Sequence, residues 1–436
     1  MDAFFAAVEV LLDPSLAGRP VVVGGAGRRG VVAAASYEAR VFGVRSAMPS
    51  SQALRLCPQA VFVPGRYDCY SEISQQIHAI FQAYSPLVEP IALDEAFLDV
   101  SGARGLFGDG PTIGHRIRRQ VHEDLGLSAS VGVAATKFVA KLASEAAKPK
   151  ANRDGVHPGA GVVVVEPGEE LAFLHPLPIE ALWGVGPVTS SRLRGLGVTT
   201  IGQLAAVPVD TLVGTLGSAQ GRHLHELAWA RDARRVEPNR AVQSIGHEET
   251  YPWDRVDREE LNREVVRMAD AVASRLRAAG VTGRTVMLKL RYGDFTTITR
   301  SVTVTSAVDS GPAIARAAGW LLDQVSVAPG VRLLGVSVAN LAQGAPTQLM
   351  LPLDASPPAQ SSAGPGPGPA TRAAPEQADA SWHDATRAVD RVRARFGPGA
   401  VGPAVLLRDE GLRLKRQGDN QWGPARAGAR EEESEP

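Results

Sequence analysis

The hydrophobic pattern of this chain changes twice along its length, and this constrains its architecture more than any single residue. Residues 1 to about 165 mix buried strands with helices, and residues 168–230 are typical of short helices separated by Gly and Pro. Residues 244–342 alternate longer strands and helices. A chain of 436 residues is also too long to fold around one ordinary hydrophobic core, so the sequence predicts several domains of α/β and α+β type.

The first part of the chain shows separate elements. Apolar runs at 18–25 and 30–36 predict buried strands, and apolar residues at helical spacing predict a helix over 70–81. The apolar run that begins at Phe4 predicts the first turns of another helix. The segment VEPIALDEAFLDV, residues 88–100, predicts a β-hairpin.

The last part of the chain ends in segments of biased composition. Before them we expect a two-layer α+β domain with helices at 259–279 and 310–326 and strands at 284–292, 296–305 and 331–340. Residues 355–380 are rich in Pro, Gly, Ser and Ala and predict a disordered linker. The tail, residues 381–436, is of unknown role, with one helix predicted at 384–396.

Composition excludes some classes of protein. The chain has no run of about 18 apolar residues and no signal-peptide pattern, so we expect a cytoplasmic protein without a membrane span. Cys57 and Cys69 have no metal-ligand spacing, and we expect reduced thiols. Lys+Arg and Asp+Glu both number 46, so binding to nucleic acid would need locally clustered basic residues.

Asp94 and Glu95, adjacent in LDEAF, are the first candidates for chemistry. Neighbours on a regular strand point to opposite faces, so both can reach one ligand only at a strand end or a bulge. Such a pair is most often a solvated turn, but the apolar flanks Ile91, Leu93 and Phe97 indicate burial. Buried carboxylates repel unless a cation neutralises them, and oxygen ligands suit Mg²⁺.

Two further segments carry basic residues at helical spacing. In TKFVAKLASEAAKPK, Lys137, Lys141 and Lys148 fall on one side of a helix, which is either a basic stripe or an ordinary solvated face. In SYEARVFGVRSAMP, Tyr37 and Arg40 are three residues apart. A phenol and a guanidinium on one helix face suit phosphate oxygens, although the two could also form a plain surface pair.

The segment WGVGPVTSSRLRGLG, residues 183–197, predicts a tight turn that leads into a helix. A tight turn at Gly184 and Gly186 that leads into a helix exposes backbone N–H groups at the positive end of that helix, which suits a phosphate and reads no base sequence. Arg192 lies close by, and a similar segment, IGQLAAVPVDTLVGTLG, follows. A single Gly-Val-Gly is more often a plain turn.

Taken in order, five segments resemble a Y-family DNA polymerase of the DinB type: DAFFAAVE, SYEARVFGVRSAMP, LDEAFLDV, SVGVAATKFVAKLASEAAKP and the helix-hairpin-helix GVGP. The resemblance covers residues 1 to about 353. It implies a right-hand polymerase with palm and fingers at 1–167 (fingers about 12–70, palm about 71–167), a helix-hairpin-helix thumb at 168–232 and an α+β little finger at 244–342. The implied activity is error-prone, translesion, template-directed addition of deoxynucleotides with two Mg²⁺ ions.

The resemblance also implies roles for individual residues. Asp94 is similar to the carboxylate that bridges the metals, and Glu95 to the one beside the primer 3′-hydroxyl. Phe5 is similar to the steric gate, which clashes with a 2′-hydroxyl. The residues that hold the incoming triphosphate would be Tyr37, Arg40 and Lys148.

Contacts with DNA and with the β sliding clamp are implied in the same way. Duplex contacts would come from Gly184, Gly186, Arg192, Lys289, Arg291 and Arg300. The peptide QLMLPL lies within 343–354, the segment expected to dock on the clamp, and its anchors would be Gln348, Leu349 and Leu351. We expect primer-template DNA and deoxynucleoside triphosphates as the other partners and a monomeric polymerase.

One departure from the family pattern concerns the start of the chain. The family has an aspartate two residues before the position of Asp2, at the end of an initial strand, and that carboxylate binds both metals. Met1 falls where the family offers a backbone carbonyl to a metal. Two hypotheses follow: an active polymerase whose sequence as shown starts at an internal methionine, or a catalytically impaired relative that binds DNA and the clamp.

Overall fold

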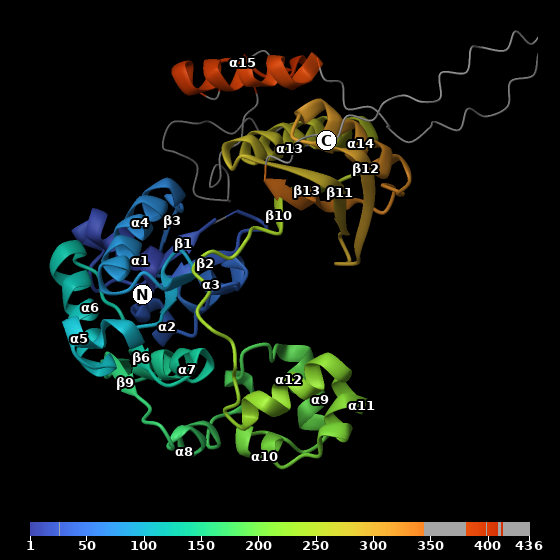
Figure 1. The fold of residues 1–436 in the computed structure, drawn as a ribbon. Coiled ribbons are helices and arrows are strands. Elements are labelled where there is room, and N and C mark those ends of the chain that lie inside the picture. Colours follow the sequence, from blue (N-terminus) through green and yellow to red (C-terminus); the bar gives the residue numbers. More distant parts are fainter. Residues whose placement is uncertain (26, 344–380, 398, 409–410, 413–436) are drawn as a thin grey trace, which may run out of the picture. The chain divides into compact units, whose positions relative to one another are not determined.

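The computed structural model describes residues 1–25, 27–343, 381–397, 399–408 and 411–412 (Figure 1). It divides into two compact units, Met1–Arg240 and Ala241–Arg416, which are described separately. Within the described ranges, no helix combines the length and the apolar character needed to cross a membrane. Cys57 and Cys69 are both free.

The first unit contains a small three-stranded sheet. Its order is β2-β1-β3, in which β1 (Val21–Gly24) pairs antiparallel with β2 (Val32–Ala35) and parallel with β3 (Val61–Val63). The apolar runs that predicted strands at 18–25 and 30–36 form β1 and β2, and these predictions are confirmed. The helices α2 (Tyr37–Val41) and α3 (Ser50–Leu56) follow β2.

The first unit also contains a β-hairpin. The hairpin consists of β4 (Val88–Ala92) and β5 (Glu95–Leu98), as predicted for residues 88–100. Apolar faces of three helices pack into one core beside it: α1 (Phe4–Leu12), α4 (Tyr67–Tyr84) and α6 (Gly110–Leu125). The parallel pair β6 (Val131–Val133) and β9 (Val162–Val164) flanks the helix α7 (Lys137–Ala147). Shorter elements are η1 (Pro14–Leu16), η2 (Ser101–Ala103), α5 (Arg104–Phe107), β7 (Lys150–Asn152) and β8 (Gly155–His157).

The predicted series of short helices is confirmed between residues 168 and 230. These elements are α8 (Glu170–Leu174), η3 (Ile179–Ala181), α9 (Pro187–Gly195), α10 (Ile201–Ala205), α11 (Val209–Leu216) and α12 (Ser218–Ala228). Leu193 and Leu224 are buried in a core that also contains Phe138 and Val139 of α7. The helical region therefore packs on the same helix that carries the predicted basic stripe.

The second unit is a four-stranded antiparallel sheet of order β10-β13-β11-β12 with two helices on one face (Figure 1). The strands are β10 (Ser244–Arg255), β11 (Val281–Tyr292), β12 (Thr297–Val308) and β13 (Val331–Gln343), and the helices are α13 (Arg258–Ala278) and α14 (Gly311–Asp323). Buried and less buried residues alternate along β11, and the buried set packs against the helices. The predicted two-layer α+β arrangement is confirmed, but the strand β10 was not predicted.

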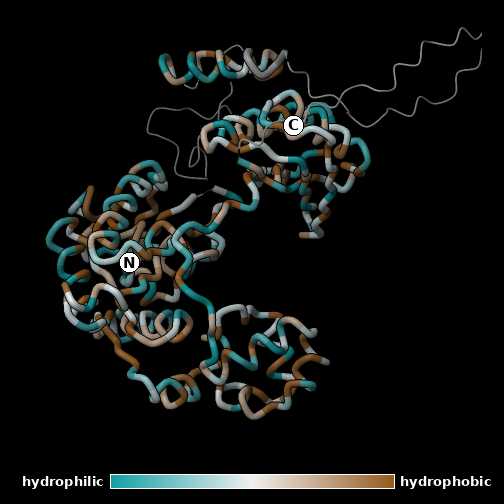
Figure 2. The backbone as a smooth tube through the Cα atoms, in the orientation of Figure 1, coloured by the Kyte–Doolittle hydropathy of each residue, from teal (hydrophilic) through white to brown (hydrophobic). Residues whose placement is uncertain are grey.

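Beyond the sheet domain, the structure describes the helix α15 (Ser381–Phe396), which confirms the helix predicted at 384–396. Figure 2 shows hydrophilic and hydrophobic residues alternating along it. Arg277 of α13 donates two hydrogen bonds to the Asp390 carboxylate, at 2.5 and 2.8 Å, and Arg393 donates one to Asp270 at 2.9 Å. Short elements follow: η4 (Ala404–Leu406), β14 (Leu407–Arg408) and β15 (Gly411–Leu412). The predicted linker lies outside the described residues.

Candidate active site

The adjacent carboxylates lie at the turn of the β4–β5 hairpin. Ala92 pairs with Glu95, so Leu93 and Asp94 form a two-residue turn and Glu95 is the first residue of β5. The Ser74 hydroxyl of α4 donates a hydrogen bond to the Leu93 carbonyl and ties the turn to the helical core. This strand end is the arrangement in which neighbouring side chains can serve one ligand.

The N-terminal residues lie against this turn. The Met1 amino group donates a hydrogen bond of 2.9 Å to the main-chain carbonyl of Asp94, and it lies 3.5 Å from the Asp94 carboxylate. Asp2 is buried, and its carboxylate accepts a hydrogen bond of 2.8 Å from the Ser130 hydroxyl. The structure thus brings Met1 and Asp94 together, while metal binding by the Met1 carbonyl stays a prediction.

Two lysines and a second glutamate surround Glu95. The Lys141 Nζ donates to one Glu95 oxygen at 2.9 Å and to a Glu145 oxygen at 3.0 Å. The Lys148 Nζ lies 2.7 Å from Glu145 and 3.7 Å from Glu95. Sequence reasoning missed Glu145, although its spacing from both lysines is that of ion pairs on a helix.

These contacts keep the carboxylates charged. Burial alone would raise the pKa of Glu95, but the hydrogen bond from Lys141 and the charges of Lys141 and Lys148 hold that pKa below its ordinary value of 4.5. Burial acts on Glu145 in the same direction, and the same two lysines lower its pKa. The site therefore presents an ionised Glu95 at neutral pH, already balanced by positive charge.

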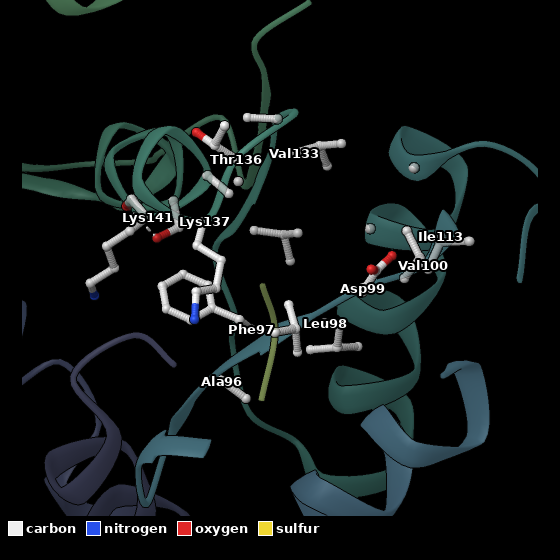
Figure 3. Close-up of a pocket in the computed structure, with 18 of the residues that line it drawn as sticks. Ala96, Phe97, Leu98, Asp99, Val100, Ile113, Val133, Thr136, Lys137 and Lys141 are labelled. Atoms are coloured by element: carbon white, nitrogen blue, oxygen red, sulfur yellow. Dashed lines mark hydrogen bonds between the residues drawn. The ribbon is translucent and has the colours of Figure 1, made fainter. Parts of the chain in front are cut away.

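The third lysine of the stripe, Lys137, forms an ion pair with Glu89. The Lys137 Nζ lies 2.6 Å from a Glu89 oxygen of β4 and 5.4 Å from the centre of the Phe97 ring. Figure 3 shows the Lys137 and Phe97 side chains beside each other. A pocket of about 660 Å³ separates this hairpin from α6 and α7, and its wall includes Asp94, Glu95, Lys141 and Lys148. The basic stripe is therefore one wall of a pocket and faces the hairpin carboxylates.

The structure also places Tyr37 and Arg40 together. The helix α2 starts after Ser36, whose hydroxyl accepts a hydrogen bond from the Ala39 N–H at 3.3 Å. The Arg40 guanidinium lies 4.6 Å from the centre of the Tyr37 ring and donates to the Ala35 carbonyl at 3.0 Å. These contacts fix the guanidinium beside the phenol.

The Tyr37 hydroxyl is buried, and the described part of the chain supplies no acceptor for its proton, since the neighbouring Arg40 guanidinium can only donate. Burial and then the charge of Asp2 raise the Tyr37 pKa from 10.0 to about 12, with a smaller raising effect from Glu145 and an opposing effect from Arg40. Because buried polar groups are nearly always hydrogen-bonded, this hydroxyl indicates a place for a ligand.

Phe5 lies on α1 and is half-buried. Its ring stacks on Tyr70 of α4, with centroids 4.4 Å apart and an angle of 14° between the planes. The helix begins abruptly after Ala3, which has the left-handed φ of 49°, so tertiary contacts must hold this start in place. Contact of Phe5 with a sugar stays a prediction.

The predicted helix-hairpin-helix turn has an open backbone. Gly184 has a φ of 93°, and Gly186 precedes α9 without a side-chain cap. A Cβ built on either glycine would meet no described atom within 4 Å. Arg194 pairs with Glu180 at 2.8 Å, whereas the exposed Arg192 forms no ion pair with the described residues.

The three basic candidates of the second unit do not share one surface. Lys289 and Arg291 alternate with the buried residues of β11 and lie on the sheet face opposite the helices. Arg300 pairs directly with the buried Leu288, so its side chain is on the helix side, at the exposed edge strand β12. Lys289 is 2.7 Å from a Glu248 oxygen. The clamp-binding candidates Gln348, Leu349 and Leu351 lie outside the described residues.

The oxygen atoms at the hairpin turn suit a divalent cation. No group of three or more His, Cys, Asp or Glu side chains converges for a metal within the described ranges. Asp94 and Glu95 supply two carboxylates, and the Asp94 carboxylate is partly exposed. Mg²⁺ is commonly held by one or two carboxylates together with substrate phosphates, so this donor set fits such an ion.

Comparison with known families agrees with this geometry. Residues 1–145 match the impB/mucB/samB family, and residues 242–351 match the C-terminal domain of the same family. Residues 167–198 match the IMS family HHH motif. The chain belongs to the impB/mucB/samB family of Y-family, DNA-directed DNA polymerases, whose members generally use divalent metals.

Individual relatives support the same assignment. The chain is 48% identical over 345 residues to DNA polymerase IV of Streptomyces coelicolor, covering 78% of this chain and 70% of that protein. It is 42% identical over 406 residues to DNA polymerase IV 2 of Mesorhizobium japonicum, covering 92% of each. A solved Y-family chimera of Dbh and Dpo4 matches with a TM-score of 0.70 at 26% identity, covering 78% of this chain and 97% of that chain.

Proposed function

We propose that this chain is an error-prone translesion DNA polymerase of the DNA polymerase IV kind, which extends a primer 3′ end and acts in DNA repair and damage tolerance. One observation carries the proposal: the carboxylates of Asp94 and Glu95 share a pocket wall with Lys148. The buried Tyr37 hydroxyl, for which the described residues supply no acceptor, adds a donor suited to a phosphate. Two structural neighbours, an insertion ternary complex of Dbh DNA polymerase and a Dbh ternary complex with substrates, support DNA and a nucleotide as the substrates.

The incoming triphosphate would be held by Tyr37, Arg40 and Lys148. The Tyr37 hydroxyl can donate to a phosphate oxygen without giving up a protein contact among the described residues. Lys148 has three N–H donors and can keep its contact with Glu145 while a phosphate accepts another. Three donors around one anion would place its negative charge beside the hairpin carboxylates.

Asp94, Glu95 and the Met1 carbonyl would hold two Mg²⁺ ions. When bound, these ions lower the energy of the 3′-alkoxide and neutralise charge as pyrophosphate leaves. Lys141 fixes the position of Glu95 through the 2.9 Å hydrogen bond. It also keeps Glu95 ionised, so that the carboxylate is available as a ligand.

Duplex binding would use both units. The turn at Gly184 and Gly186, where a Cβ would meet no described atom within 4 Å, leaves room for a phosphate of the duplex to approach the start of α9, with Arg192 as a charged partner. Lys289 and Arg291 suit the same backbone from the open sheet face, and Arg300 from the edge strand. The segment with Gln348, Leu349 and Leu351 would dock on the β sliding clamp as an extended peptide.

Primer extension tests the proposal directly. The 436-residue chain should extend a primer opposite an undamaged base and opposite a damaged one with Mg²⁺, and Asp94→Asn should abolish extension while leaving primer-template binding intact. Binding without extension under Mg²⁺ and Mn²⁺ would instead favour the catalytically impaired, DNA- and clamp-binding relative. Extension that survives Asp94→Asn would refute the role of this residue.

A further inference from the structure

We infer that Glu9, Arg66 and Tyr70 position the ring of Phe5 and thereby set how strongly ribonucleotides are excluded. The inference rests on the proposed function, in which Phe5 lies under the sugar of the incoming nucleotide. None of these three residues belongs to the carboxylate or phosphate sites described above. Their role would be to hold the gate residue, without touching the substrate.

The four residues form a contact between two helices. Phe5 and Glu9 are four residues apart on α1, and Arg66 and Tyr70 are four apart at the start of α4. Residues at this spacing lie on the same helix face. Each helix therefore presents one ring and one charged group to the other. The ring contact and the charged contact both require the same alignment of α1 against α4.

The ring contact leaves Phe5 little freedom on its covered side. Tyr70 is fully buried and stacks in parallel on Phe5, with centroids 4.4 Å apart. Tyr67 meets the same ring edge-on, at 5.7 Å and 75°. Phe5 itself is only half-buried, so Tyr70 supports a ring that is partly exposed.

The charged contact fixes Tyr70. Its hydroxyl donates a hydrogen bond of 2.5 Å to Glu9, whose carboxylate is 1% exposed. The Arg66 Nε donates to both Glu9 oxygens, at 3.1 and 3.0 Å, and its Nη2 donates to one of them. The supporting ring is thus held by stacking on its face and by a charge-assisted hydrogen bond at its far end.

Packing alone does not require this arrangement. A phenylalanine at 70 and an apolar residue at 9 would fill the same space without taking a carboxylate out of water, which is costly unless it is paired. A paired carboxylate adds directional hydrogen bonds that an apolar contact lacks. The geometry is therefore suited to prevent the Tyr70 ring, and with it Phe5, from moving away from a bulkier sugar.

The test compares the dissociation constants of a ribonucleoside and a 2′-deoxynucleoside triphosphate. Both bind the full chain on a primer-template that ends in a dideoxynucleotide, so no chemistry is needed. Tyr70→Phe removes only the hydroxyl, and we expect the ratio of the two constants to fall about three- to tenfold, the range of one lost hydrogen bond. Glu9→Gln should lower the ratio similarly, and the double variant should lower it no further.

A matched control comes from the same helix. The Tyr84 hydroxyl donates to Gln120 at 3.0 Å, and its ring contacts Phe107. Tyr84→Phe should therefore leave the ratio unchanged. If it lowers the ratio as much as Tyr70→Phe does, general loosening of α4 explains the effect and the inference is wrong.

Phe5→Ala separates this inference from the proposed function. If Phe5→Ala leaves the ratio unchanged, Phe5 is not a gate and the proposed role of Phe5 fails. If Phe5→Ala lowers the ratio while Tyr70→Phe and Glu9→Gln do not, only the positioning role is overturned. Should Glu9→Gln fail to fold, Tyr70→Phe and Arg66→Lys decide in its place.

Discussion

Each unit of the molecule contains a cluster of glutamates and basic residues, and the two clusters differ in access to solvent. In the first unit the side chains of Glu95, Lys141, Lys148 and Glu145 are between 21 and 46% exposed, and all but Glu145 line a pocket. In the second unit Arg267 is 4% exposed and lies between two acidic side chains that are 3 and 11% exposed. Similar charges therefore occupy an open site and a sealed one.

In the sealed cluster of the second unit, the charged groups pair with one another. Arg267 of α13 donates to Glu264 at 2.8 Å and to Glu249 of β10 at 2.5 Å, which ties the helix to an edge strand. The open cluster is balanced too, but its lysines keep donors that a phosphate can use. Charge pairing by itself therefore does not indicate a functional site. Pairing that leaves hydrogen-bond donors and carboxylates accessible to a ligand does indicate one.

The largest expected effect concerns the open cluster. Glu95→Gln keeps the side-chain shape and removes the negative charge, so we expect the single-turnover rate of nucleotide incorporation to fall about a thousandfold. The free energy of unfolding should change by less than about 1 kcal/mol, because this ion pair is partly solvated. Rapid-quench primer extension and urea unfolding measure the two quantities. Glu123→Gln, an exposed glutamate on α6, is the control and should change neither.

The sealed cluster should respond in the opposite way. Arg267→Met leaves two buried carboxylates without their counterion, and we expect the second unit to lose about 3 to 5 kcal/mol of stability. Arg263→Met, an exposed position one turn earlier on α13, should cost less than about 0.5 kcal/mol. Urea unfolding measures both variants. A loss of stability no larger than that of the control would contradict the contrast between the clusters.

A smaller effect on nucleotide affinity and stability should distinguish a hydroxyl that binds a ligand from a hydroxyl that stabilises the fold. Tyr37→Phe removes a buried hydroxyl for which the described residues supply no acceptor, so nucleotide affinity should fall about tenfold while the free protein gains up to about 1 kcal/mol of stability. Tyr292→Phe removes a hydroxyl that donates to the Ser326 carbonyl at 2.6 Å. That control should lose about 1 kcal/mol and keep its nucleotide affinity. Equal destabilisation by both changes would remove the distinction.

The smallest expected effect is spectroscopic. The Tyr37 pKa of about 12 lies above the ordinary value of 10.0, so the neutral phenol is the favoured buried form. Because the unfolded phenol ionises at the ordinary pKa while the folded one does not, stability falls as pH rises from the ordinary pKa through the folded value. The difference in tyrosinate absorbance between the wild type and Tyr37→Phe should show a midpoint near 12. A midpoint at the ordinary value would mean that the hydroxyl is solvated.

The elements that could be predicted from the sequence are those with strong local patterns. The strands at 18–25 and 30–36, the hairpin at 88–100 and the helix at 384–396 all form. The strand β10 was missed because it carries polar residues on both faces: Glu248 and Thr250 on the outer face, and His247 and Glu249 on the face that also carries Ile245 and Tyr251. Such a segment resembles a polar connection, and its place in the sheet follows from pairing with β13 and not from its own composition.

The site was predictable in its residue types and less so in its contacts. Asp94 and Glu95 and the lysine stripe were found from spacing, but the bond between Lys141 and Glu95 joins residues 46 positions apart. The separation of Arg300 from Lys289 depends on the β11–β12 register, since a shift of one residue would reverse the faces. Sequence spacing does not reveal such a register.

Most of the elements, and the kind of chemistry they carry, could be predicted from local patterns, because periodicity, caps and turn residues act over a few neighbouring positions. The family too could be predicted, from motifs in a specific order. Which charges are sealed and which stay accessible became clear only from the packed fold, as did the contact of Phe5 with a tyrosine that a buried carboxylate fixes. Burial and pairing arise between segments distant in the chain, so they exist only once those segments have packed.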